Sequence, residues 1–220
     1  MAPIAPPPSD SPEGGTGEAT EDGRSPAGPR GARRARRYDP DRRTRILDAA
    51  LDVIAEHGTA GATHRHIAAR ADVPLGSVTY HFASLADLLA QAFARHVELQ
   101  SARFAELFEG VETRERFVEV LVELVHGGPA RHRSAVLGFE LHLAALRNPD
   151  LRVLTQNWTS DSRAVLARFT GPETAARLDA LLEGMIMHAL LAAAPEPREA
   201  ARAAIVQTLG PADQGEAHVS

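Results

Sequence analysis

The stretch THRHIAARADVPLGSVTYHF, residues 63–82, has the pattern of two short helices joined by a tight turn. Its opening threonine can cap the first helix through its hydroxyl group. Asp72 stands where the chain must turn, and Asp tolerates the left-handed backbone region better than most residues. Pro74 suits the first turn of the second helix, where its missing N–H costs nothing. Val78 and Phe82 are four apart and share one face, so small, hydroxyl and aromatic side chains remain on the free face, which suits the major groove of DNA.

The segment just before the first predicted helix is dense in arginine. Residues 33–45, RRARRYDPDRRTR, hold seven arginines, and residues 33–97 hold ten arginines against seven acids. Positive charge is therefore concentrated around the helix pair, where a phosphate-binding surface would need it. We expect the segment to act as an arm on the minor groove or the phosphates. The alternative is a solubilising tail without fixed contacts.

With its flanks, the helix pair resembles the TetR family of one-component transcription regulators. The resemblance covers residues 42–97 and rests on RILDAALDVIAEHG, HIAARADV, GSVTYHF and SLADLL in that order. It implies that Tyr80 and His81 touch phosphates while Ser77 and Thr79 face the groove. The DNA-binding residues that we expect are Arg37, Arg42, Arg43, Thr63, His64, Leu75, Gly76, Ser77, Thr79, Tyr80 and His81.

The remaining sequence is helical in pattern throughout, and no strand-like alternation competes with it. Apolar residues recur at helical spacing, and Gly and Pro fall between the periodic segments. Gly58 is expected to end the first helix with a left-handed conformation. The fold class is therefore all-α, with further helices predicted over 41–57, 84–109, 114–126, 131–147, 150–170, 173–194 and 197–209.

Composition and helix pattern predict four segments. Residues 1–38 are rich in Pro, Gly, Ser and acids and should form a disordered arm that ends in arginines. Residues 39–99 should form a three-helix DNA-binding domain with a helix-turn-helix. Residues 100–210 should form a helical bundle, to which the resemblance assigns effector binding and dimerisation, and residues 211–220 a flexible tail.

For the C-terminal half, the resemblance implies dimerisation and small-molecule sensing. The helices over 150–170 and 173–194 are expected to pair with their copies in a homodimer. The expected interface is the apolar stripe of the second helix, with small residues for close approach: Leu181, Leu182, Met185, Ile186, Ala189 and Leu190, with Gly184 and Ala192. The expected effector-binding residues, each equally suited to ordinary core packing, are Phe104, Phe117, Leu121, Phe139, His142, Trp158, Met185 and His188.

Glu140 stands out on the otherwise mostly apolar helix predicted over 131–147. Because Glu is rarely buried unless paired, we expect it to face solvent or to meet an arginine or a ligand.

Several function classes are disfavoured. The chain has no cysteine, so disulfides and thiolate metal sites are excluded and a cytoplasmic location is expected. His64 and His66 are two apart and diverge on a helix, which makes them a poor metal pair. No HExxH, phosphate loop, nucleophile elbow or membrane-length apolar run is present. We therefore expect neither an enzyme nor a cofactor.

The sequence thus predicts a homodimeric repressor that leaves a palindromic double-stranded DNA operator when a small molecule binds. The alternative is a helical dimeric regulator controlled by a protein partner, with no small-molecule effector. A ligandable cavity in the C-terminal half would discriminate between the two.

Overall fold

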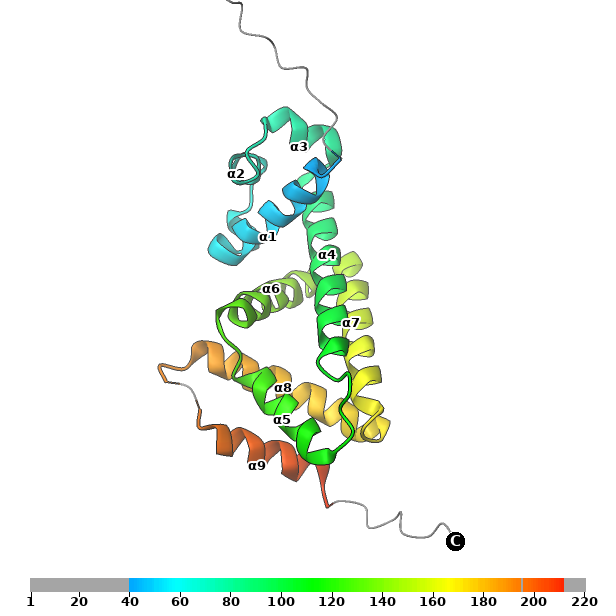
Figure 1. Cartoon of the computed structure of the whole chain (residues 1–220). Helices are drawn as coiled ribbons and strands as arrows, with labels where there is room; N and C mark the ends of the chain where they lie inside the picture. The colour runs from blue at the N-terminus through cyan, green and yellow to red at the C-terminus, as the bar shows by residue number, and fades with distance from the viewer. Residues whose placement is uncertain (1–39, 195, 212–220) are drawn as a thin grey trace, which may run out of the picture. The chain divides into compact units, whose positions relative to one another are not determined.

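The computed structural model describes residues 40–194 and 196–211, and within these ranges it is all-α (Figure 1). The helices are α1 (Arg42–Gly61), α2 (His64–Arg70), α3 (Leu75–His81), α4 (Leu85–Glu106), α5 (Arg114–Val125), α6 (Pro129–Ala145), α7 (Pro149–Ala167), α8 (Pro172–Leu191) and α9 (Arg198–Leu209). The all-α prediction is confirmed. The predicted arm up to residue 38 and most of the predicted tail lie outside the described residues.

Side-chain caps begin several of these helices, as their sequence suggests. The Thr63 hydroxyl accepts from the His66 N–H at 3.2 Å, and the Ser84 hydroxyl accepts from the Asp87 N–H at 3.0 Å. The Asp87 carboxylate accepts in turn from the N–H of Ala83, one residue before the cap, at 3.0 Å, so side-chain hydrogen bonds run in both directions across the start of α4.

Helices α7 and α8 each begin with a proline, one residue earlier than predicted. Sequence reasoning treats Pro149 and Pro172 as breaks between helices. In the structure each occupies the first turn of the following helix, because its fixed φ suits that position and no N–H is needed there.

Helix α1 contains a sharp break at Gly58, which has φ 68° and ψ 173°. Residues that carry a side chain rarely adopt this backbone conformation, so glycine is required at this position. The regular helix ends at the predicted position, and one further helical turn follows it to Gly61.

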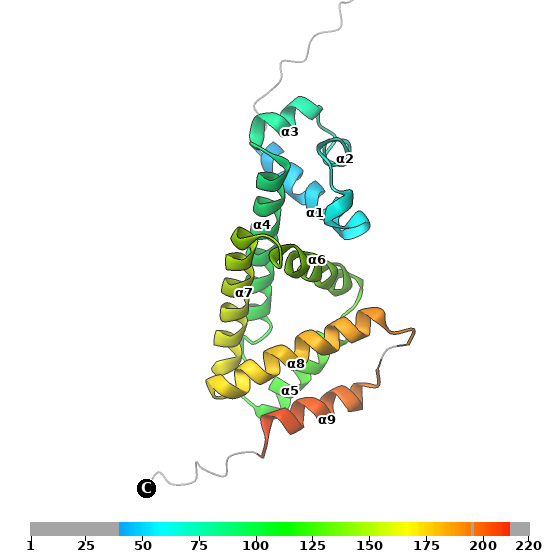
Figure 2. The same ribbon diagram turned by 180° about the vertical axis from the view of Figure 1, so that it is seen from behind.

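Two apolar clusters hold the described residues together. The first joins α1 to the helix pair and the first half of α4, and it also takes in Leu137, Leu141, Ala145 and Leu151 from α6 and α7. The second joins α5, α8 and α9 with the end of α7. Helices α4 and α7 lie side by side in both views (Figure 1, Figure 2), and α6 packs against α1. The first cluster thus continues past residue 99, the predicted domain boundary.

Candidate nucleic-acid interface and effector cavity

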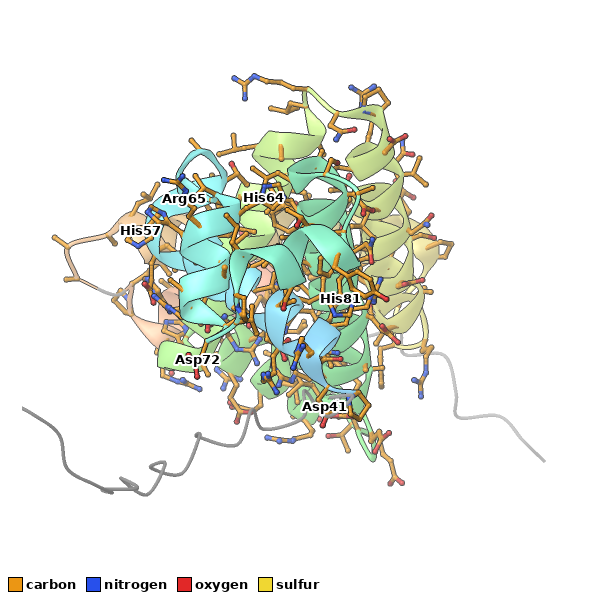
Figure 3. All side chains as sticks on the ribbon, turned by 90° about the horizontal axis from the view of Figure 1, so that it is seen from above. Asp41, His57, His64, Arg65, Asp72 and His81 are labelled. Atoms are coloured by element: carbon orange, nitrogen blue, oxygen red, sulfur yellow. The ribbon has the colours of Figure 1, made fainter. Side chains whose placement is uncertain are left out.

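Helices α2 and α3 form the helix-turn-helix, and Asp72 lies at the turn between them (Figure 3). Asp72 has φ 51°, as predicted for a residue that tolerates the left-handed region. Val78 is fully buried and Phe82 is 2% exposed, so they fix α3 on the core. The opposite face of α3 is consequently turned outward.

The outward face of α3 carries the side chains predicted to meet DNA. Tyr80 is 84% exposed and Leu75 is 42% exposed. A Cβ atom at Gly76 would meet nothing within 4 Å, so the backbone is open to a close partner. The Thr79 hydroxyl donates to the Gly76 carbonyl at 3.3 Å and is exposed, whereas Ser77 is half-buried.

The other predicted DNA-binding residues surround this face. The Arg43 guanidinium lies 5.4 Å above the Phe82 ring and bonds Gln91, which fixes it at the end of α3. His81 meets the Tyr80 ring edge-on at 5.2 Å. The Thr63 hydroxyl accepts the capping hydrogen bond at the start of α2. Arg42 and His64 are half-buried, and Arg37 lies outside the described residues. The structure thus brings a tyrosine, two histidines and two arginines together on α2, α3 and the start of α1.

A cavity of about 510 Å³ lies among α4, α5, α6, α7 and α8. Four of the eight residues predicted to bind an effector line it, namely Phe104, Phe139, His142 and Trp158. Phe117, Leu121 and Met185 are buried in the second apolar cluster instead, because their helices turn them toward α9 and the end of α7. His188 is exposed on α8 and is not part of the cavity wall.

Trp158 is the centre of the aromatic wall. Its ring stacks on His142 with centroids 5.8 Å apart and meets the buried His96 edge-on at 5.9 Å. Gly138 leaves room for it, since a Cβ there would lie 3.0 Å from the indole ring. Burial lowers the pKa of His96 to about 4, so the ring behind Trp158 is neutral near pH 7.

Sequence reasoning missed the charged residues of the cavity wall. Asp179 and Glu183 of α8 line it, and so does Arg131 at the start of α6. Arg163 bonds Asp179 at 2.9 Å, but burial still raises the pKa of Asp179 above its ordinary value. His142 Nδ1 donates to Glu183 at 3.0 Å, which holds the pKa of Glu183 below its ordinary value. The available signal was the i, i+4 spacing of two acids on a mostly apolar helix.

The remaining wall residues are mostly apolar or uncharged. They are Gln100, Arg103, Glu106, Leu107, Leu124, Ala130, Ser134, Ala135, Gly138, Thr159, Ser162, Leu166, Leu182 and Ile186. An apolar wall with a few convergent polar groups is the usual form of a small-molecule site.

Helix α6 lies between the cavity and the helix-turn-helix. Toward α1, Glu140 accepts from the Thr59 N–H at 2.8 Å, just after the break at Gly58. The predicted partner of Glu140, an arginine or a ligand, is wrong, because the carboxylate instead accepts from a backbone N–H. Arg133 of α6 pairs with Asp52 of α1, and Asp52 also lies 3.9 Å from Arg70 of α2. Asp52 of α1 thus lies between an arginine of α6 and an arginine of α2.

The apolar face of α8 that was predicted to form the dimer interface includes two residues that the structure buries within the chain. Leu182 is 4% exposed and Met185 is 9% exposed, and both pack in the second cluster, so neither is free for a partner. The outward face of α8 instead carries Ala180, Gly184, Met187 and Leu191, which recur at helical spacing.

Comparisons with known proteins agree with this architecture. The model of bacterial regulatory proteins of the tetR family matches residues 46–92, and the tetracyclin repressor-like C-terminal domain matches residues 112–211. A solved member of the TetR family from Streptomyces coelicolor A3 is 40% identical, with a TM-score of 0.67, over 78% of this chain and all of that one. The chain belongs to the TetR family.

Further relatives include a drug-binding protein and a named transcriptional regulator. The multidrug binding protein EbrR, solved with imidazole, is 37% identical, with a TM-score of 0.66, over 81% of this chain and all of EbrR. The HTH-type transcriptional regulator UidR of Escherichia coli (strain K12) is 30% identical over 115 residues, which is 52% of this chain and 57% of UidR. The family resemblance read from the sequence is confirmed, and so is the expectation of a regulator rather than an enzyme. Among the helices that the structure describes, none is long and apolar enough to cross a membrane.

Proposed function

We propose that this protein is a dimeric repressor that binds a palindromic operator and leaves it when a small molecule enters the cavity. The observation that carries the proposal is the pairing of an exposed helix-turn-helix face with a cavity of about 510 Å³ in one chain. Tyr80 and Arg43 supply phosphate-binding groups, and Ser77 and Thr79 face the groove. This division of roles follows from their chemistry, because hydroxyls on the recognition helix can reach base edges.

In the dimer, the second subunit supplies a second helix-turn-helix that contacts DNA. Two helix-turn-helix units on a two-fold axis read half-sites about one helical turn apart, so a palindrome mirrors the symmetry of the protein. The outward face of α8 suits this contact because Gly184 and Ala180 permit close approach, while Met187 and Leu191 supply apolar area. The outward face of α7, with Val153, Ser160 and Ala164, would complete a four-helix interface.

The effector is expected to be aromatic. Solved structures of EbrR contain ethidium, proflavin or malachite green, and the ethidium complex is 40% identical to this chain with a TM-score of 0.65. In this chain the Trp158 and His142 rings offer an aromatic wall on which such a ligand could stack. The rival, a dimer controlled by a protein partner, does not need such a cavity.

Release requires that effector and operator favour different conformations, since a ligand shifts only an equilibrium between states that it distinguishes. Helix α6 is suited to this coupling because it lines the cavity and also bonds α1 through Glu140 and Arg133.

The test begins with selection of random double-stranded DNA by the purified chain, followed by footprinting of the promoter beside its own coding region. A palindromic site protected on both half-sites supports the proposal. Malachite green is then titrated into the protein–operator complex and, as a control, into the free operator, with release followed by fluorescence anisotropy of labelled DNA. Failure to select any sequence would refute operator binding, and protection of a single half-site would refute the dimeric mode.

A further inference from the structure

Some charged side chains of the cavity wall have a partner within the protein, and others have none. The two acids that α8 contributes to the wall are engaged inside the protein: Asp179 accepts from Arg163 at 2.9 Å, and Glu183 accepts from His142 at 3.0 Å. A cationic ligand that used either carboxylate would have to compete with these partners. The Asp179 charge is therefore compensated by an arginine, and one oxygen of the ionised Glu183 carboxylate is occupied by the His142 hydrogen bond.

A second pair of charges lies at the end of α4. Arg103 and Glu106 both line the cavity, are three residues apart and are exposed. Their charges are opposite and screened by solvent, so this pair gives the cavity no strong preference.

Arg131 differs from all of these groups. It is half-buried in the wall, and it forms no ion pair or side-chain hydrogen bond with any residue in the described parts of the chain. Its stem folds over Gly127, where an added Cβ would lie 2.2 Å from the Arg131 Cδ, so only glycine there permits this position. Burial lowers the pKa of Arg131, and no neighbouring acid counters that effect. A guanidinium stays charged in proteins, and a half-buried charge without a partner is costly.

Much of the same cavity wall is apolar and aromatic. Phe104, Phe139, Trp158 and Leu182 line the same cavity. A ligand that satisfied both features would combine a ring system with a single negative group. Carboxylates are the natural match, because the guanidinium fork binds them through two parallel hydrogen bonds.

We propose that the effector is an amphipathic aryl carboxylic acid whose carboxylate binds Arg131 and whose rings pack on Trp158. The proposal rests on the effector function proposed above and names the chemical class of that effector. It also makes Arg131 the residue that distinguishes acids from neutral or cationic aromatic compounds.

The test uses the full chain and three probes of similar size: naphthylacetate, naphthylethanol and naphthylethylammonium. Binding is measured by isothermal titration calorimetry. We expect naphthylacetate to bind about ten- to a hundredfold more tightly than naphthylethanol, as a hydrogen bond to a charged group would give. Arg131→Gln should remove this preference while leaving naphthylethanol binding unchanged. Arg131→Lys, which keeps the charge but not the fork, should retain part of it.

The matched control is Arg147→Gln, an exposed arginine just after α6 that does not line the cavity. This variant should keep the full preference for the acid. The proposal is overturned if naphthylethylammonium binds most tightly, if the three probes bind equally or not at all, or if Arg131→Gln keeps the preference.

Operator release separates this proposal from the proposed function. If malachite green releases the operator and naphthylacetate does not, the charge assignment is wrong and the effector function stands. If both acid and dye bind the cavity and neither releases the operator, the effector function itself fails.

Discussion

Tyr80 and Thr79 are adjacent on α3, yet their positions predict different roles. Tyr80 is 84% exposed, whereas the Thr79 hydroxyl bonds the Gly76 carbonyl at 3.3 Å and is held along the helix. If the Tyr80 hydroxyl contacts phosphate, Tyr80→Phe should weaken binding equally on all operator variants. Thr79→Ala should instead change the preference among variants, by about 1–3 kcal/mol if a good base contact is lost. Anisotropy titrations on a panel of operators would measure both, and the opposite pattern would reverse the assignment.

His96 should make stability depend on pH. Burial lowers its pKa from 6.5 to about 4 in the folded protein, so the unfolded chain binds more protons between these values. Stability from this group is fully present above pH 6.5 and is lost as the pH falls toward 4. Between pH 7 and pH 5 the expected loss in free energy of unfolding is about 2 kcal/mol.

Urea denaturation of the wild type and of His96→Gln at both pH values checks this expectation. The variant keeps a neutral polar side chain, so its stability should fall less between pH 7 and pH 5. An equal fall in both proteins would show that other groups cause the acid sensitivity.

At the scale of elements, the break in α1 is held by α6. A Cβ at Gly58 would lie 3.3 Å from a Glu140 carboxylate oxygen, and Gly58 has φ 68°. Gly58→Ala should therefore add a steric conflict to the backbone strain, with a total cost of roughly 1–3 kcal/mol. Gly210 has nearly the same backbone angles, φ 71° and ψ −175°, with nothing within 4 Å of its Cβ position.

Gly210→Ala is therefore the matched control for Gly58→Ala in thermal denaturation. Gly210→Ala should introduce the backbone strain without the steric conflict, so it should lower the stability of the protein less than Gly58→Ala does. In a Glu140→Ala background the difference between the two glycine variants should shrink. A constant difference would mean that the Glu140 carboxylate adjusts without cost.

At the scale of the whole molecule, the dimer should depend on the outward face of α8. Leu191 is 79% exposed in the single chain, and in the proposed interface Leu191→Glu would bury an unpaired charge. We expect monomers at micromolar concentration by light scattering. Val206→Glu, an exposed position at 42% on α9, should leave the dimer intact. A dimer that survives Leu191→Glu would place the interface elsewhere.

The arginine-rich segment before α1 should affect DNA binding through charge. If it contacts phosphates, deleting residues 1–37 should weaken binding and flatten the slope of log affinity against log salt by about 0.9 for each lost contact. Titrations at several salt concentrations would measure the slope. An unchanged slope would mean that the segment is a solubilising tail.

The sequence by itself determined the local features of this protein. Thr63 and Ser84 cap helices, Asp72 adopts the left-handed conformation at the turn, and Gly58 interrupts α1. These features follow from the sequence because each depends on one residue and its nearest neighbours in the chain. Helical periodicity separates buried from free positions within α3, so the exposed face of the helix-turn-helix could also be predicted.

Only the tertiary structure decided which helix covers each apolar face. The periodicity of α8 shows that Leu182 and Met185 are apolar positions, but not that α8 packs them within its own chain. Because periodicity does not show which helix covers an apolar face, Phe117 and Leu121 were expected in the cavity. For the same reason the sequence did not indicate that Arg131 lines the cavity or that Glu140 bonds Thr59. Such contacts join residues far apart in the chain, and the packing of whole helices sets them rather than any local preference.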